Sequence, residues 1–195
     1  MKKDKKTQIV EAAITVFARE GLERGRISDI AAEAGIGKGT VYEYFRSKDE
    51  IFSAIEVAVL GEMMSQINEL LAYDRVPSET LRLLMEQGID AMIEMGDAIL
   101  IVTELWAQGA RGLWHDRGKT SLARIYGEFR DRIKLVLQKG IDSGEFRKMN
   151  LDGVATLLMA FMDGLAWQYV LLKDETEFNK ARNEAIQSFM KGIEK

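Results

Sequence analysis

The pattern of apolar positions along the chain predicts α-helices from end to end. Apolar residues recur mostly at spacings of three and four, and few segments show the alternation that is typical of strands. The helical segments are separated by glycines and by the only proline, which are typical of helix ends and loops. We therefore expect an all-α protein.

Most of the chain lies in long predicted helices. Residues 74–78 contain the proline and form a loop, Gly96 and Gly144 each end a helix, and the segment from Gly109 to Gly118 is expected to be a flexible connection. The expected helices span residues 47–73, 79–95, 99–108, 119–142, 151–172 and 175–193.

Residues 27–42 predict two short helices joined by a tight turn. Ser28 is placed to cap the first helix, and Gly35 to end it in a left-handed conformation. In the second helix, residues 38–45, Val41 and Phe45 are four residues apart and face inward. The outward residues are then Lys38, Thr40, Tyr42 and Tyr44, all able to donate to phosphates or base edges. This is the layout of a helix-turn-helix, whose second helix enters the major groove of DNA.

A capping box, Ser47 to Glu50, begins the long helix that follows. Lys48 lies in the first turn of this helix, which opposes the helix dipole unless a phosphate is also bound there. Glu43, on the second short helix, either accepts from a cytosine amino group or pairs with a neighbouring arginine, and we favour the pair.

These motifs resemble those of TetR-type transcriptional regulators over residues 7–55. The resemblance rests on Phe17 and Gly21 in the first helix, on Ile30-Ala31 with Ala34-Gly35-Ile36, on Gly39-Thr40-Val41-Tyr42-Glu43-Tyr44-Phe45, and on Ser47-Lys48-Asp49-Glu50-Ile51-Phe52. It implies a three-helix DNA-binding domain, residues 1–50, joined to a larger helical ligand-binding and dimerisation domain, residues 51–195. The DNA-contacting residues expected from the resemblance and the exposed pattern are Ser28, Lys38, Gly39, Thr40, Tyr42, Tyr44 and Lys48.

The last two predicted helices are rich in small and apolar residues, which suits a four-helix bundle formed with a second copy of the chain. The alternative is that they only close the core of one chain. In the resembling family these helices form the homodimer. Dimerisation would place two recognition helices about one DNA turn (roughly 34–36 Å) apart, so that they contact a palindromic operator.

Adaptable methionine and aromatic side chains in the larger domain suggest a site for a small apolar or amphipathic effector. The resemblance alone implies that the protein is a repressor released by this effector. The alternative is that these side chains belong to the core. The candidate ligand-binding residues are Met63, Met92, Glu104, Trp106, Tyr126, Phe129, Arg130 and Met162.

The net charge of −4 is distributed unevenly along the chain. Residues 1–50 hold ten Lys or Arg and nine Asp or Glu, so the acidic excess lies in the remainder. Lys2, Lys3, Lys5 and Lys6 form either a basic arm on DNA or a solvated terminus. Positive potential at a DNA site does not require a basic protein.

Enzymatic chemistry finds little support in the sequence. The chain has no cysteine and a single histidine, His115 beside Asp116, so we expect no metal site and no cofactor. The series Asp90, Glu94 and Asp97 is typical of a solvated helix face. We expect a cytoplasmic protein without a signal peptide or a membrane span. The remaining alternative is a helical protein-interaction module that does not use its helix-turn-helix on DNA.

Overall fold

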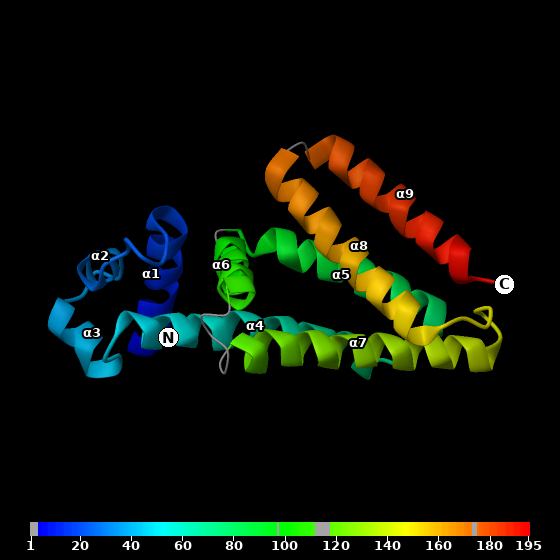
Figure 1. Ribbon diagram of the computed structural model, residues 1–195, viewed down its shortest axis with the longest axis horizontal. Coiled ribbons are helices and arrows are strands. Elements are labelled where there is room, and N and C mark those ends of the chain that lie inside the picture. Colours follow the sequence, from blue (N-terminus) through cyan, green and yellow to red (C-terminus); the bar gives the residue numbers. More distant parts are fainter. Residues whose placement is uncertain (1–3, 97, 112–117, 173–174) are drawn as a thin grey trace. The chain divides into compact units, whose positions relative to one another are not determined.

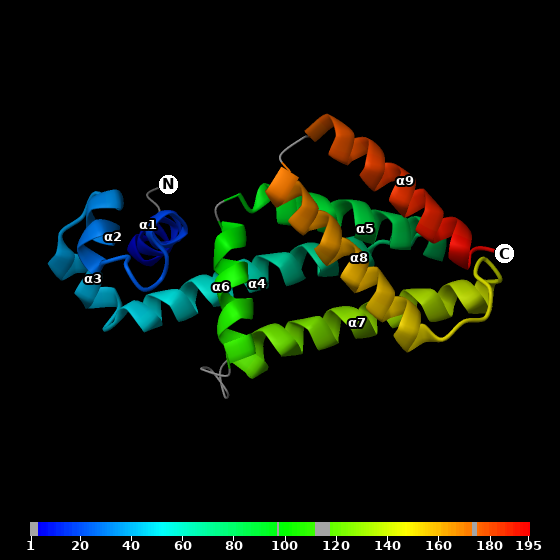
Figure 2. The same cartoon turned by 45° about the horizontal axis from the view of Figure 1, so that its top comes forward.

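The computed structural model describes residues 4–96, 98–111, 118–172 and 175–195. These residues form nine α-helices and no strand, which confirms the expected all-α fold (Figures 1 and 2). The helices are α1 (Lys5–Glu20), α2 (Ile27–Glu33), α3 (Lys38–Tyr44), α4 (Lys48–Ala72), α5 (Pro77–Glu94), α6 (Ala98–Arg111), α7 (Gly118–Ser143), α8 (Leu151–Leu172) and α9 (Glu175–Ile193).

The bounds of α8 and α9 are those predicted, and most other helices differ by one or two residues at each end. Helix α6 is the exception, because it continues to Arg111 and includes Gly109, which we had expected in a flexible connection. Gly96 and Gly144 follow helix ends with φ angles of 52° and 84°, as their predicted role requires. The rest of the expected connection, residues 112–117, lies outside the described residues.

The described helices group into two compact units, and α4 and α7 each contribute to both. The first unit comprises the described residues of Met1–Glu62 and Met95–Ala123, and the second those of Met63–Glu94 and Arg124–Lys195. Our expected division at residue 50 differs from this grouping, in which α6 joins the first unit.

The first unit has its own apolar core, built where α1, α2, α3 and the start of α4 meet. Ile30 and Val41 are completely buried in it, and the rings of Phe17 and Phe52 pack edge to face with centroids 6.4 Å apart. The side-chain amide of Gln8 donates to the carbonyl of Ala34 at 2.6 Å, which ties α1 to the end of α2. This core therefore fixes the orientation of the short helices.

The second unit encloses a larger apolar core. Helix α5 packs against α8 and α9, and α8 and α9 lie side by side in both ribbon views (Figures 1 and 2). Phe146, in the segment between α7 and α8, is completely buried and donates its backbone N–H to the carbonyl of Gly140 at 2.9 Å. The backbone N–H of Arg147 donates to the carbonyl of Ile193, which fastens the end of α9.

Helix α8 is more apolar than the sequence analysis allowed. The segment Leu151–Leu171 is long and apolar enough to cross a membrane by length and composition, and 33% of it is buried. Our expectation that no segment approaches a membrane span was therefore wrong on length and composition. Core helices of soluble proteins meet the same criterion, so the helix is weak evidence for a membrane.

Candidate functional site

The turn between α2 and α3 has the geometry that a helix-turn-helix needs. Gly35 has a φ of 63°, in the left-handed region that favours glycine. The backbone N–H of Ile36 donates to the carbonyl of Ala31 at 3.0 Å, so the chain turns back tightly against the end of α2. The predicted role of Gly35 is confirmed.

Helix α3 presents one face to the core and the other to solvent. Val41 and Phe45 are buried at 0% and 1% exposure, and this fixes the rotation of the helix about its axis. Tyr42 and Tyr44 point outward with exposures of 48% and 40%. Of the other expected contacts, Lys38 and Gly39 are exposed and Thr40 is half-buried. The five candidates on α3 therefore lie on the accessible part of this helix.

Two cation–π contacts organise basic groups around α3. The ammonium group of Lys38 lies 5.8 Å from the ring centroid of Tyr42, and that of Lys6 lies 5.7 Å from the ring centroid of Phe45. Lys6 belongs to the lysine-rich start of the chain, of which Lys2 and Lys3 lie outside the described residues. Lys38 thus holds positive charge beside the outward Tyr42, and Lys6 holds it beside the end of α3.

The expected cap of α2 by Ser28 is wrong. The helix begins at Ile27 with Arg26 as the N-cap residue, and the carboxylate of Asp29 accepts the backbone N–H of Arg26 at 3.3 Å. Ser28 lies inside the first turn, exposed, with its hydroxyl 3.3 Å from the other oxygen of Asp29. Its hydroxyl remains accessible to a phosphate, which keeps the DNA contact a prediction.

The start of α4 forms half of the expected capping box. The backbone N–H of Glu50 donates to the Ser47 hydroxyl at 3.1 Å, but the Glu50 carboxylate accepts from the backbone N–H of Arg46 instead of Ser47. Lys48 donates from Nζ to the carbonyl of Glu23 at 2.7 Å. The ammonium group is therefore held beside the loop that precedes α2.

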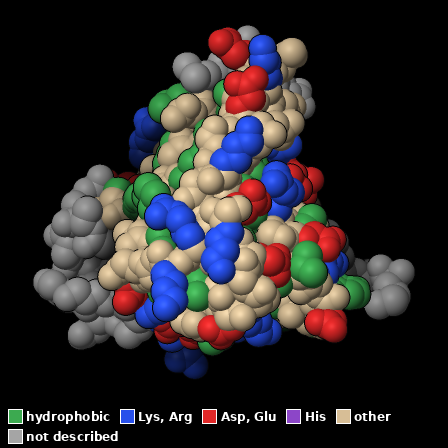
Figure 3. All heavy atoms as spheres, turned by 90° about the vertical axis from the view of Figure 1, so that its right-hand side faces the viewer, with side chains coloured by type: hydrophobic (Ala, Val, Ile, Leu, Met, Phe, Trp, Pro, Cys, Tyr) green, Lys and Arg blue, Asp and Glu red, His purple; other side chains and the backbone are tan. Residues whose placement is uncertain are grey.

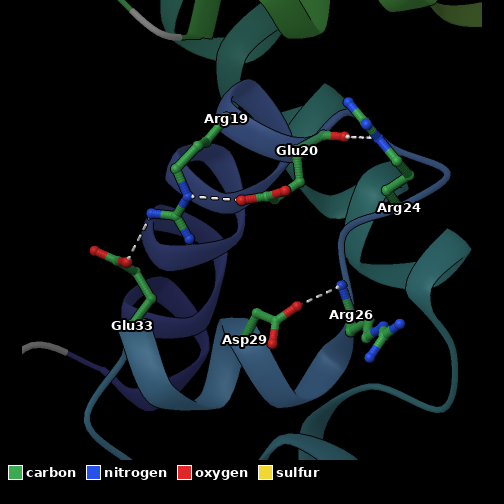
Figure 4. Close-up of polar contacts among 6 residues, drawn as sticks. All are labelled: Arg19, Glu20, Arg24, Arg26, Asp29 and Glu33. Atoms are coloured by element: carbon green, nitrogen blue, oxygen red, sulfur yellow. Dashed lines mark hydrogen bonds and ion pairs between the residues drawn. The ribbon is translucent and has the colours of Figure 1, made fainter.

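An open, highly charged hollow lies on the first unit, lined by α1, the loop after it, α2 and Lys48. Arg19 lies between two carboxylates (Figure 4). Its guanidinium group is 3.0 Å from the carboxylate of Glu20 and 3.6 Å from that of Glu33. These two partners raise the pKa of Arg19, the hydrogen bond to Glu20 most strongly. The charge of Arg19 is thus balanced within the protein, and the three residues together carry a net charge of −1.

Arg24 and Arg26 line the same hollow, and our sequence analysis did not identify them as candidates. Nε of Arg24 donates to the backbone carbonyl of Glu20 at 3.1 Å (Figure 4), while Arg26 contacts Asp29 through its backbone and not through its guanidinium group. Neither guanidinium group forms an ion pair with the described residues. The signal was the run Glu23-Arg24-Gly25-Arg26 directly before the helix-turn-helix.

Glu43 lies exposed on α3 and forms no ion pair with the part of the chain that the structure describes. The arginine partner that we favoured is therefore missing there. Its carboxylate is free to accept from a donor on DNA, the other alternative left open by the sequence.

The candidate effector residues are divided between the two units. Met63, Tyr126, Phe129 and Met162 all belong to or pack against the core of the second unit. Met92 on α5 and the exposed Arg130 on α7 belong to the same unit, whereas Glu104 and Trp106 lie on α6 in the first unit. Four of the eight candidates are thus brought around one apolar cluster.

Within that cluster, the hydroxyl of Tyr126 lies 3.1 Å from each carboxylate oxygen of Asp163 on α8. Burial raises the pKa of Asp163, and the hydrogen bond from Tyr126 acts in the opposite direction. Our sequence analysis missed Asp163. The available signal was an isolated acidic residue in the middle of an apolar helix.

In the acidic series predicted to be solvated, Asp90 has a structural partner and Glu94 is exposed. Asp90 forms an ion pair with Arg182 of α9, so it joins two helices of the second unit. His115, Asp116 and Asp97 lie outside the described residues.

The first unit combines a buried anchor face, a short outward helix and surrounding basic groups, which together define the helix-turn-helix class of DNA-binding protein. The comparisons with known proteins narrow this class. Residues 9–55 match the model described as bacterial regulatory proteins, tetR family, and residues 77–192 match the C-terminal model of BetI-type transcriptional repressors. The chain belongs to the TetR family of transcriptional regulators.

Individual relatives agree with this assignment. The HTH-type transcriptional repressor KstR2 of Rhodococcus jostii is 28% identical over 166 residues, which cover 85% of this chain and 78% of the relative. A transcriptional regulator from Saccharomonospora viridis, solved with choline, has a TM-score of 0.82 at 22% identity, with 97% of each chain covered. FadR from Bacillus subtilis, solved with stearoyl-CoA, has a TM-score of 0.76 at 22% identity, covering 97% of this chain and all of that one (100%).

Proposed function

We propose that the protein is a repressor that binds a palindromic operator as a homodimer and is released by a small amphipathic molecule. The observation that carries DNA recognition is the fixed rotation of α3, in which buried Val41 and Phe45 leave Tyr42 and its neighbours on the outside. A short helix held in this way by a core can enter the major groove without reorganisation. Membership in the TetR family supports the same role.

The proposed DNA interface combines contacts of two kinds. Thr40 and Tyr42 would meet base edges, with Lys38 and Gly39 beside them, because they lie on the accessible part of α3. Ser28, Tyr44 and Lys48 would position the protein on phosphates.

Homodimerisation through α8 and α9 is supported by an apolar surface that no described residue covers. Leu157 and Leu171 on α8 are 59% and 77% exposed. One set of exposed and half-buried residues on α8 repeats at spacings of three and four, which is typical of a helix-packing seam. The residues of α9 that continue this seam are small. The residues are Gly153, Leu157, Ala160, Gly164, Gln168 and Leu171 on α8, and Ala181, Ala185, Ser188 and Gly192 on α9.

The surface seen from the end of α9 has a different character. Figure 3 shows Lys, Arg, Asp and Glu side chains interspersed over this face, with hydrophobic side chains scattered between them. Such mixed charge is typical of a solvated surface. The α8–α9 seam is therefore our candidate for the contact with a second copy, and covering it would also account for the apolar character of α8.

The dimer surface can be tested with two leucines of similar exposure. Leu157→Glu places a charge in the proposed seam and is expected to convert the dimer to monomer in sedimentation experiments, because a carboxylate is costly in an apolar interface. Leu135→Glu on α7 is the matched control, since Leu135 is 65% exposed and lies outside the seam. A Leu157→Glu protein that stays dimeric would contradict the proposed interface.

The effector is proposed to bind in the second unit, where methionine and aromatic side chains gather. Known relatives support small amphipathic ligands: FadR of B. subtilis was solved with stearoyl-CoA, and the S. viridis regulator with choline. Release requires that the effector bind the DNA-incompetent arrangement of the dimer more tightly than the competent one. We propose a cytoplasmic location, because such a regulator acts on chromosomal DNA.

The experiment that tests DNA binding is a titration of the purified protein against DNA from upstream of its own gene, with scrambled DNA as the control. We expect specific binding to the upstream DNA. The logarithm of its binding constant should fall with the logarithm of salt concentration, with a slope of about 0.9 per phosphate contact. Equal affinity for both DNAs would contradict operator recognition at this site.

A further inference from the structure

Asp163 is a carboxylate of the second unit whose charge is not balanced by a cation among the described residues. It is half-buried on α8, and its only hydrogen-bond partner among the described residues is the hydroxyl of Tyr126. A phenol donates one proton, whereas an ionised carboxylate offers about four lone-pair sites. The neutral hydroxyl therefore leaves most of the accepting capacity, and all of the charge, of Asp163 without compensation.

Two other acidic residues of the same unit are paired with cations. Asp90 forms an ion pair with Arg182, and Asp152, on the same helix as Asp163, lies 2.7 Å from Nζ of Lys134. Within the described ranges Asp163 has no such pair. A half-buried charge without a counter-charge is unfavourable, and burial accordingly raises the pKa of Asp163. A cation bound beside it would remove this cost.

The surroundings of Asp163 suit the apolar part of an organic cation. Phe129 follows Tyr126 by three residues on α7, and Trp167 follows Asp163 by four residues on α8, so each ring lies on the same helix face as its polar neighbour. Tyr126 and Phe129 pack against the core cluster to which Met162 belongs. Aromatic faces attract cations, and methionines adapt to varied apolar shapes.

We propose that Asp163 and Tyr126 bind the positively charged group of the effector, so that the effector is an amphipathic amine or quaternary ammonium compound. This inference rests on the proposed function, in which the second unit binds an effector, and adds its chemical class. An anionic head group would meet the negative charge of Asp163 and be repelled. The carboxylate thus selects cations, and the aromatic and methionine side chains contact the apolar body.

The probes that test this are hexyltrimethylammonium and benzyltrimethylammonium, with hexanol and benzyl alcohol as their neutral counterparts. Calorimetric titration gives the affinity of wild type, Asp163→Asn and the matched control Asp152→Asn, which changes an exposed carboxylate on the same helix. We expect a cation to bind wild type and Asp152→Asn with equal affinity, and the neutral counterpart to bind more weakly. Asp163→Asn should bind the cation roughly tenfold or more weakly than wild type, because the charge of the hydrogen-bonded pair is removed.

A purely structural role for the Asp163–Tyr126 hydrogen bond gives a different result. The Asn variant would then melt at a lower temperature than wild type while binding the cations as before, and this outcome would overturn the inference. A failure of both cations to bind wild type would overturn it as well. We expect the unliganded Asn variant to be at least as stable as wild type, because it lacks the uncompensated charge.

A parallel titration with the upstream DNA separates this inference from the proposed function. If wild type binds that DNA specifically and neither cation binds the protein, the inference fails and the repressor proposal stands. If the cations bind but no specific DNA complex forms, the proposed operator recognition fails and the cation site stands.

Discussion

A single methyl group added to α7 should have opposite effects at two of its glycines. At Gly140, an added Cβ would overlap ring atoms of Phe146, with Cγ at 2.8 Å. That ring is completely buried, and the hydrogen bond between the Phe146 N–H and the Gly140 carbonyl holds the two backbones together. The ring can therefore give way only by disturbing the core. At Gly127, nothing lies within 4 Å of an added Cβ.

The magnitudes follow from two competing effects. Replacing glycine by alanine inside a helix gains about 0.5–1 kcal/mol, whereas overpacking a core costs about 1–3 kcal/mol. We therefore expect Gly140→Ala to destabilise the protein by about 1–2 kcal/mol and Gly127→Ala to stabilise it by up to about 1 kcal/mol. For a chain of this size, each kcal/mol shifts Tm by about 2–4 °C.

Thermal unfolding followed by circular dichroism measures both variants against wild type. Gly88→Ala on α5 is a further control, because its added methyl group would meet only the flexible end of Met162. Gly88→Ala should fall between the other two. A Gly140→Ala protein as stable as Gly127→Ala would refute the packing argument.

Three further predictions concern charge. Lys48→Gln should make the plot of log binding constant against log salt concentration less steep, by about 0.9 for each phosphate that Lys48 neutralises in the wild-type complex. Titrations at several salt concentrations measure this slope. Glu145→Ala should destabilise the protein by about 1 kcal/mol at pH 7, because Glu145 accepts from the backbone N–H of Ser78 in the first turn of α5. The hydrogen bond from the Ser78 hydroxyl lowers the pKa of Glu145. The stabilisation by Glu145 is therefore fully present above the unfolded-state pKa and is lost as pH falls through the folded-state pKa. Tm measured as a function of pH would show this loss. Burial raises the pKa of Asp163, so the unfavourable contribution of its charge to folding stability grows as pH rises through that pKa. The Tm of Asp163→Asn should therefore rise relative to that of wild type over the same pH range. A Tm difference that does not change with pH would contradict this prediction.

The features that the sequence predicted well are those that depend on local periodicity. The bounds of α8 and α9, and the inward position of Val41 and Phe45, follow from which residues share a helix face. Gly35 was identifiable because a helix C-terminus favours a residue that tolerates positive φ.

The features that the sequence missed depend on tertiary packing. Helix α2 begins two residues earlier than a cap by Ser28 would allow because Ile27 packs against the core of the first unit, so Asp29 provides the cap. The pairing of Tyr126 with Asp163 joins residues 37 positions apart. Helical periodicity places each on a face of its own helix but does not give the register between the two helices, so only the packed structure brings them together.

The most direct test of DNA recognition by α3 is the ratio of affinities for upstream and scrambled DNA, measured for wild type and for Tyr42→Ala. Lys139→Ala on α7, an exposed residue far along the chain from α3, is the control. We expect wild type and the control to prefer the upstream DNA by about a thousandfold or more. Tyr42→Ala should remain folded, because Tyr42 lies outside the core, and should lose most of that preference. An unchanged preference in folded Tyr42→Ala would contradict the account and favour a helical interaction module that does not use α3 on DNA.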